Sequence, residues 1–286
     1  LFQQFLMQNK KQIKIAIESA DNAFKLWSEF SSKERSDILK NFYTLVKKNK
    51  KKLAEIITLE SGKPIQESVV EVDYGASFIE WSAEQALRTN GEIFDSPETE
   101  KKMFTIKKPV GVVAAITPWN FPLAMVTRKV SAAVAAGCSV ILKPSELTPI
   151  TAYELGNLSI SSGFPPGVLN IVTGNPKMIG KIMATHHSVK KITFTGSTEV
   201  GKLLINQSSS TVKNISLELG GNAPFIVFSD ANVDEAVEGF IMAKFRNAGQ
   251  TCISANRLFV HKTIFDQFLE KLIEKIKSLK VGNGMD

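Results

Sequence analysis

Cysteine and histidine are scarce in this chain. Its 286 residues include two cysteines, Cys138 and Cys252, and three histidines. Two cysteines so far apart do not form a disulfide framework, and they favour a reducing compartment, which we predict to be the cytoplasm. The histidines have no metal-ligand spacing with one another or with the cysteines, so we expect no bound metal.

Long apolar runs are also missing. The nearest candidate, residues 130–142, is shorter than the ~20 residues that a membrane-spanning helix needs, and it ends on Lys143 and Pro144. Residues 1–4 show no basic segment followed by an apolar one, so we expect no secretory signal. The sequence therefore predicts a protein that has no membrane partner.

Arginine is rare although the chain is basic. The formal net charge is +7, but only five of the 35 basic residues are arginine, the residue on which recognition of base edges relies. The lysine run at residues 47–52 contains no aromatic residue for base stacking. Apolar residues at helical spacing on both sides of this run place its lysines on the solvated face of one helix. We therefore expect no nucleic-acid partner.

The elements that are present indicate an α/β protein. Residues up to about 90 have helical periodicity, with a capping-box pattern at Ser31 and Glu34. After residue 110, short apolar strands at 111–116, 139–142, 168–172, 191–194 and 214–219 alternate with helices at 123–136, 151–162, 177–185 and 199–208. This alternation is typical of a parallel sheet covered on both faces. We predict a doubly wound, Rossmann-like dinucleotide-binding domain formed by residues 1–90 and 110–219.

Two segments lie outside that domain. In residues 91–109 polar residues flank a short alternation, which indicates an extended arm or hairpin that pairs with another subunit during oligomerisation. Residues 220–286 contain strands at 224–228 and 257–260, helices at 233–246 and 263–279, and a loop with Cys252. They stop without a finished sheet. We expect them to be the start of a second, catalytic α/β domain that is truncated here.

Two polar turns follow strands of the predicted sheet. In residues 116–122 two prolines flank Trp119 and Asn120, and a fixed amide is a good donor to an oxyanion, although a helix-capping Asn explains this motif more simply. Residues 194–201 combine glycines and a hydroxyl at a helix start, which suits a phosphate. Leu203 stands where a magnesium-binding P-loop requires Ser or Thr, which excludes an ATPase of that kind.

A third group consists of one carboxylate and one thiol. Glu218 lies between two leucines at a strand end, where burial requires a partner or a raised pKa, as a general base working near neutral pH has. Cys252 follows a small-residue turn that can expose a thiolate. A lone cysteine is more often part of a core, and Cys138, among small apolar residues, fits that description.

In order and spacing, these motifs resemble the aldehyde dehydrogenase superfamily over the whole chain. The matching segments are residues 59–64, 118–122, 143–146, 194–201, 217–221 and 249–252. The resemblance implies an NAD(P)-dependent enzyme in which Cys252 is the nucleophile. Glu218 would activate the water that hydrolyses the thioester, and Asn120 would form an oxyanion hole with the Cys252 backbone N–H.

The resemblance also implies a cofactor site. Lys143 and Glu146 would hold the adenosine ribose, and Trp119 and Ser197 the pyrophosphate. The full set of cofactor-binding candidates is Thr117, Pro118, Trp119, Lys143, Ser145, Glu146, Thr195, Gly196, Ser197 and Gly201. Relatives that prefer NADP often carry a small hydroxyl residue in place of Glu146. Since a carboxylate repels a 2′-phosphate, we expect NAD rather than NADP.

Within the superfamily, residues 220–228 and 244–252 most resemble the succinate-semialdehyde dehydrogenases. That subfamily holds the distal carboxylate of its substrate with two arginines, and Arg128 and Arg246 stand at the matching positions. The resemblance implies oxidation of succinate semialdehyde to succinate by a homodimer or homotetramer at full length. Two alternatives stay open: a dehydrogenase of another small aldehyde, such as glutarate semialdehyde, and a non-catalytic fragment of such an enzyme.

Overall fold

The N-terminal part of the chain is helical. The computed structural model describes residues 7–286, and residues 1–4, to which the prediction about a secretory signal refers, lie outside the described residues. The first helices are α1 (Lys10–Trp27), α2 (Ser32–Lys48), α3 (Lys50–Ser61) and α4 (Ile65–Ala86). The predicted capping box begins α2: Ser31 Oγ accepts from the Glu34 N–H, and the Glu34 carboxylate accepts from the Ser31 N–H.

The helix expected around the lysine run is interrupted. α2 ends and α3 begins at Asn49, whose side-chain amide donates to the Leu45 carbonyl at 2.8 Å. Asparagine competes for backbone hydrogen bonds in this way, which is why it disfavours helix interiors. The prediction of one continuous helix was therefore wrong. The lysines do lie outward, and Lys47 and Lys50 both form ion pairs with Asp73 at 2.5 Å.

The centre of the molecule is a five-stranded parallel sheet. Its strands are β3 (Val112–Ile116), β4 (Ser139–Lys143), β5 (Leu169–Ile171), β6 (Val189–Gly196) and β7 (Asn214–Leu219), in the spatial order β5-β4-β3-β6-β7. The connecting helices are α5 (Ala124–Ala135), α6 (Pro149–Ser161), α7 (Pro176–Thr185) and α8 (Thr198–Ser208). All these strands overlap the predicted ones.

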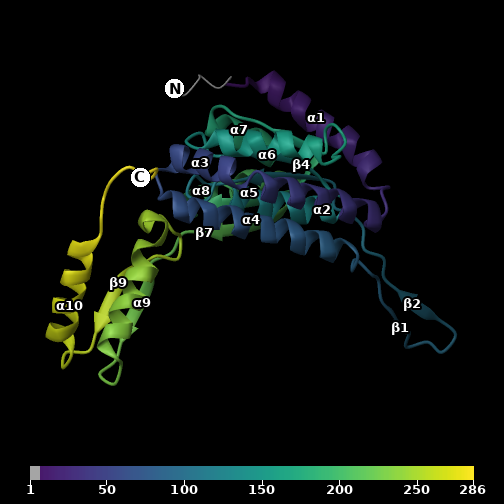
Figure 1. The fold of residues 1–286 in the computed structure, drawn as a ribbon. Coiled ribbons are helices and arrows are strands. Elements are labelled where there is room, and N and C mark those ends of the chain that lie inside the picture. Colours follow the sequence, from purple (N-terminus) through teal and green to yellow (C-terminus); the bar gives the residue numbers. More distant parts are fainter. Residues whose placement is uncertain (1–6) are drawn as a thin grey trace.

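Helices cover both faces of this sheet (Figure 1). One apolar core joins the sheet to α2–α6, and a second joins its other face to α1, α7 and α8. Every residue of β3 and β4 is buried, which explains their near-continuous apolar sequence. The predicted doubly wound α/β fold is confirmed.

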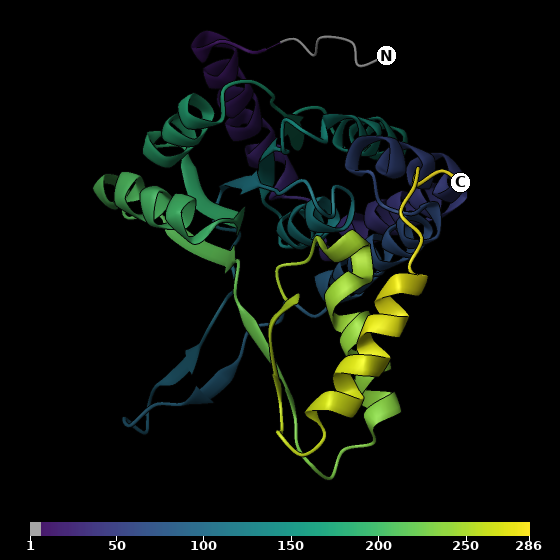
Figure 2. The same cartoon turned by 90° about the vertical axis from the view of Figure 1, so that its left-hand side faces the viewer.

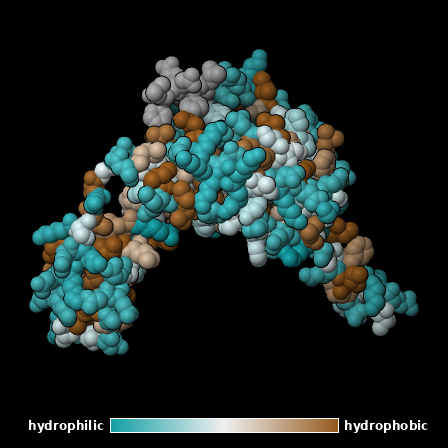
Figure 3. Space-filling view, in the orientation of Figure 1, coloured by the Kyte–Doolittle hydropathy of each residue, from teal (hydrophilic) through white to brown (hydrophobic). Residues whose placement is uncertain are grey.

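Two further pieces extend from this body. The strands β1 (Ile93–Asp95) and β2 (Lys102–Phe104) form an antiparallel hairpin that projects away from it, with all their residues exposed (Figure 1). Hydrophobic side chains are visible along this projection (Figure 3). They include Ile93, 82% exposed, and Phe104, 68% exposed.

The second piece follows β7. The strands β8 (Ala223–Val227) and β9 (Ala255–Val260) pair in parallel, and α9 (Val233–Phe245) and α10 (Phe265–Ser278) pack beside them (Figure 2). Its small core includes Val227, Phe240, Phe268 and Leu272. The strands and helices predicted for residues 220–286 are present in the predicted order.

Candidate active site

A cavity lies where the order of the central sheet reverses. β4 and β5 lie on one side of β3, whereas β6 and β7 lie on the other. Open α/β sheets bind ligands at such a switch point, beyond the carboxyl ends of the strands. The turns after β3 and β6 meet the loop between α9 and β9 there and line a cavity of about 630 Å³.

This cavity collects most of the predicted site residues. Its lining includes Pro118, Trp119, Asn120, Arg128, Thr195, Gly196, Ser197, Glu218, Arg246 and Cys252. The remaining candidates, Thr117, Lys143, Ser145, Glu146 and Gly201, do not line it. The nucleophile, base, amide and arginine candidates thus share one cavity, although they come from turns that are distant in sequence.

Asn120 is held from two directions. Its side-chain Nδ2 donates to the Gln250 carbonyl at 2.7 Å, two residues before Cys252. Its own carbonyl accepts from Lys63 Nζ at 2.6 Å and from Asn247 Nδ2 at 3.0 Å. An amide NH2 group carries two donors. One N–H ties the turn to the Cys252 loop, and the second has no protein acceptor within residues 7–286.

Cys252 lies on an unusual loop. Asn247, Ala248 and Gly249 follow one another at φ 58, 54 and 76°, in the left-handed region that favours glycine. The first two residues are strained in this conformation, which turns the chain sharply between α9 and Cys252. The Cys252 side chain is exposed, whereas that of Cys138 is buried. Burial raises the pKa of the Cys138 thiol. Cys138 is therefore part of the core, as its neighbours predicted.

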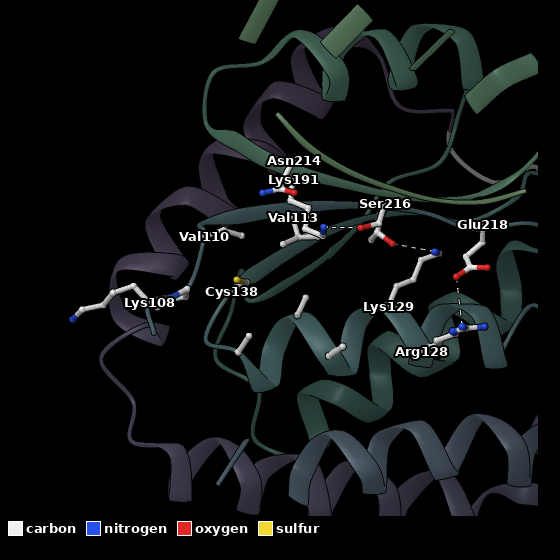
Figure 4. Close-up of a pocket in the computed structure, with 15 residues that line it drawn as sticks. Lys108, Val110, Val113, Arg128, Lys129, Cys138, Lys191, Asn214, Ser216 and Glu218 are labelled. Atoms are coloured by element: carbon white, nitrogen blue, oxygen red, sulfur yellow. Dashed lines mark hydrogen bonds and ion pairs between the residues drawn. The ribbon is translucent and has the colours of Figure 1, made fainter. Parts of the chain in front are cut away.

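Glu218 is not buried, contrary to what its neighbouring leucines suggested. Its side chain is 58% exposed, and it forms an ion pair with Arg128 at 3.6 Å (Figure 4). β7 is an edge strand with alternating burial, so Leu217 and Leu219 point toward the core and Glu218 points away from it. The carboxylate therefore has a partner and faces the cavity.

Lys129, which the sequence did not single out, lines a second cavity beside the first one. It is only 7% exposed, and its Nζ donates to Thr193 Oγ1 at 3.0 Å. Burial lowers the pKa of Lys129 to about 8; Glu218 opposes this effect, whereas Arg128 and Lys191 add to it. The second cavity of about 410 Å³ contains Lys129 and shares Arg128 and Glu218 with the first (Figure 4). The sequence signal that could have indicated it is the one lysine in the mostly apolar helix predicted at residues 123–136.

The features beside the first cavity suit a dinucleotide. Thr195 Oγ1 is buried and has no hydrogen-bond partner within residues 7–286, so it is free to accept or donate to a ligand. Ser197 Oγ caps α8 by accepting from the Val200 N–H at 3.3 Å. Gly201 allows α8 to approach β7, since a Cβ there would lie 2.9 Å from Leu219 Cδ2. Close packing of this kind brings a helix N-terminus to the sheet edge.

Lys143 and Glu146 lie beside this region. Lys143 ends β4, opposite Ile116 of β3, and its Nζ contacts the Glu146 carboxylate at 2.5 Å. Burial acts to raise the pKa of Glu146, but the hydrogen bond and the charge of Lys143 outweigh it and lower that pKa. Glu146 is therefore ionised at neutral pH. An ionised carboxylate can accept a hydrogen bond from a ribose hydroxyl.

The fold and this cavity define a Rossmann-like α/β protein with a cysteine, an amide and a carboxylate at its ligand-binding edge. A profile of the Aldehyde dehydrogenase family matches residues 2–286, and the chain belongs to this family. No cluster of three or more His, Cys, Asp or Glu side chains suited to a metal occurs within residues 7–286. In the same residues, no helix is long and apolar enough to span a membrane.

Several curated proteins are similar in sequence to nearly the whole of this chain. The chain is 52% identical to the mitochondrial succinate-semialdehyde dehydrogenase of Arabidopsis thaliana, over 96% of this chain and 52% of that protein. It is 48% identical to the NADP(+) succinate-semialdehyde dehydrogenase GabD of Escherichia coli, over 96% and 57%. It is also 48% identical to a glutarate-semialdehyde dehydrogenase of Pseudomonas putida, over 95% and 56%. The chain therefore spans about half the length of the curated relatives it matches.

A solved structure agrees with these matches. The succinate-semialdehyde dehydrogenase of Burkholderia pseudomallei superposes with a TM-score of 0.94 at 49% identity, over 96% of this chain and 57% of that one. The predicted fold and family are thereby confirmed.

Proposed function

We propose that the protein containing this chain oxidises succinate semialdehyde to succinate with NAD+ or NADP+. One observation carries this proposal: a single cavity holds Cys252, Asn120, Glu218 and two arginines. The names of the relatives support the substrate class. The chain's own residues supply a nucleophile, an oxyanion donor, a base and a pair of carboxylate ligands.

Covalent catalysis begins at Cys252. Its thiolate adds to the aldehyde carbon, and the carbonyl oxygen becomes an oxyanion. The free N–H of Asn120 and the Cys252 backbone N–H donate to this oxygen and stabilise the charge as it forms. A nicotinamide dinucleotide bound in this site would accept hydride from the former aldehyde carbon as the oxyanion re-forms a carbonyl, and the substrate would remain attached to Cys252 as a thioester.

Glu218 acts in the second half of the reaction. It takes a proton from a water molecule that attacks the thioester carbon, and Cys252 leaves as a thiolate. Its carboxylate lines the cavity that holds Cys252 and lies 3.6 Å from Arg128. Two products result, the free acid and a regenerated cysteine.

Arg128 and Arg246 are placed to recognise a carboxylate. Both line the cavity with Cys252, one from α5 and the other from the end of α9. A guanidinium presents two parallel N–H donors to a carboxylate, which neutral aldehydes cannot use. Glutarate semialdehyde is the second candidate, since one relative acts on it by name. It differs from succinate semialdehyde by one methylene, which such a site discriminates by roughly 10–200-fold.

For the cofactor we propose NAD as the preferred form. The residues that would hold it are Thr117, Pro118, Trp119, Lys143, Ser145, Glu146, Thr195, Gly196, Ser197 and Gly201. The ionised carboxylate of Glu146 favours a free ribose hydroxyl over a 2′-phosphate. Because the Glu146 carboxylate would repel a 2′-phosphate, Glu146→Ser should shift the cofactor preference toward NADP. NADP(+) is the cofactor in the name of one relative, GabD of Escherichia coli.

For the assembly we propose a homodimer or homotetramer joined through the β1–β2 hairpin. The exposed apolar residues of the hairpin, among them Ile93 and Phe104, would become buried there. We also propose the domain boundaries given above and a cytoplasmic location; three of the relatives are mitochondrial by name.

The substrate proposal is tested by comparing two aldehydes of equal chain length. Succinate semialdehyde should have a kcat/KM roughly 30–1000-fold above that of butyraldehyde, since a bidentate charged contact contributes on the order of 2–4 kcal/mol. Arg246→Leu should remove most of this difference by weakening the charged substrate. Equal efficiency on both aldehydes in the wild type would overturn the proposed substrate.

A further inference from the structure

A buried ion pair lies behind the Asn120 turn. Lys63 and Glu71 have side chains that are 0% and 1% exposed, and Lys63 Nζ lies 2.5 Å from Glu71 Oε2. Lys63 belongs to the motif at residues 59–64, to which the proposed reaction assigns no role. Ion pairs buried this completely stabilise folds little compared with apolar residues of similar volume. Their contacts therefore require another explanation.

Apart from the bond between its two members, the side-chain hydrogen bonds of this pair lead to one turn. Lys63 Nζ donates to the Asn120 carbonyl at 2.6 Å and lies 4.4 Å from the centre of the Phe121 ring. Glu71 Oε1 accepts from the backbone N–H groups of Leu123 and Ala124 at 2.9 and 3.2 Å. These N–H groups lie at the start of α5, where helix geometry leaves donors without partners. The pair thus binds the turn at Asn120 and at the residues that follow it, up to the start of α5.

The same network continues to the nucleophile. Asn247 Nδ2 donates both to the Asn120 carbonyl at 3.0 Å and to the Gln250 carbonyl at 3.2 Å. The Asn120 side chain bonds the same Gln250 carbonyl, two residues before Cys252. Lys63 and Asn247 therefore hold the backbone of Asn120, and the Cys252 loop holds its side-chain amide.

We propose that Lys63 and Glu71 are positioning residues of the active site, which hold the Asn120 amide in line with the oxyanion formed at Cys252. This inference rests on the proposed function. Neither residue lines the cavity, so both act through Asn120. A displacement of about 1 Å at a reacting group costs on the order of 10²-fold in rate, which is the loss expected when the pair is broken.

The test uses the natural protein that contains this chain and measures the pre-steady-state burst of NADH. Asn120→Ala is measured first: an unchanged burst rate there would refute the role of Asn120, and with it the proposed function. Glu71→Gln should then slow the burst on the order of 10²-fold in the wild type. In the Asn120→Ala background it should slow the burst less than about threefold, since the amide that it positions is gone.

Two measurements separate positioning from a general structural role. Alkylation of Cys252 by iodoacetamide and the Kd for NAD should stay within about threefold of wild type in Glu71→Gln. The matched control is Glu60→Gln, because the Glu60 carboxylate also accepts from two backbone N–H groups at a helix start, those of Ile150 and Thr151. It should lower thermal stability and leave the burst rate unchanged.

Some outcomes would overturn this inference. Equal losses for Glu71→Gln with and without the Asn120 side chain would show that the pair does not act through the amide. A burst rate of Glu71→Gln within about threefold of wild type would also refute the positioning role. If Glu71→Gln does not fold, the double variant Lys63→Met/Glu71→Leu is measured instead. It replaces both members of the pair and therefore leaves no lone buried charge. If that variant also fails to fold, the pair serves folding and the proposal is refuted.

Discussion

The two parallel sheets of this chain are covered to different extents. β3 and β4 are buried along their whole length, between helices on both faces. β8 and β9 have α9 and α10 on one face, and on the other Ile226, Phe228 and Phe259 are 56, 66 and 51% exposed. Parallel sheets normally have both faces covered. The central sheet is therefore complete within the described residues, whereas the second sheet leaves an apolar face open.

This difference bears on the site, because its parts are divided between the two regions. Asn120, Glu218 and Arg128 belong to the central sheet and its helix α5, whereas Cys252 and Arg246 belong to the second region. Cofactor binding is thus expected to depend on the central sheet, and covalent chemistry on both regions.

The largest effect is expected at the nucleophile. In the natural protein, Cys252→Ser should lower kcat by on the order of 10⁴-fold or more, because no other group replaces the thiolate, while NAD still binds. Cys138→Ser, just before β4, should retain activity, since the Cys138 side chain is buried and does not line the cavity that holds Cys252. Steady-state rates and a cofactor titration check both variants. Normal turnover by the Cys252 variant would refute the mechanism.

A smaller effect is expected at the base. Glu218→Gln should still release about one NADH per site in a burst and then turn over on the order of 10²–10³-fold more slowly, because hydrolysis lacks a base. Stopped-flow fluorescence separates the two phases. Loss of the burst at every pH would place Glu218 earlier in the reaction than proposed.

The next prediction concerns Lys129 and the stability of the central region. Its folded pKa of about 8 lies below the ordinary value of 10.5, so the unfolded chain binds more protons between these values. The free energy of unfolding should therefore rise as pH increases from about 8 to 10.5, by up to about 3 kcal/mol. Lys129→Met should remove this rise, as urea titrations at several pH values can show. An identical pH dependence in the variant would contradict the lowered pKa.

The smallest effect on stability is expected at the open face of the second sheet. Phe259→Ser should change the free energy of unfolding of the 286-residue chain by less than about 0.5 kcal/mol but increase its soluble yield, since exposed apolar sheet faces promote association. Ile160→Ser, at an exposed position on α6, should leave the yield unchanged. Light scattering of the purified chains compares them. Equal scattering by wild type and Phe259→Ser would show that the face does not associate.

Much of the fold could be predicted because its signals are local. β3 and β4 are continuous apolar runs that only a sheet covered on both faces can bury. The capping box at Ser31 likewise involves residues three apart. The helix break at Asn49 was not predicted, because the Asn49 side chain bonds a backbone carbonyl and interrupts the helix without changing the spacing of its apolar residues.

The site was harder to predict, because its geometry depends on strand order. Glu218 was expected near the core, but β7 lies at the sheet edge, and that position is absent from the local pattern. The burial of Lys129 and the Lys63–Glu71 pair are also products of packing between distant segments. The order of the motifs along the chain indicated which residues lie together in the site, but not how their side chains are oriented.

The central claim is that Cys252 carries the substrate as a thioester, and mass spectrometry of the acid-quenched protein and its peptides tests it most directly. Glu218→Gln is mixed with succinate semialdehyde and NAD, quenched in acid, and digested. We predict one added succinyl group per subunit, located on the peptide that contains Cys252 and removed by hydroxylamine. An unmodified Cys252 peptide in a sample that has produced NADH would contradict covalent catalysis at this residue.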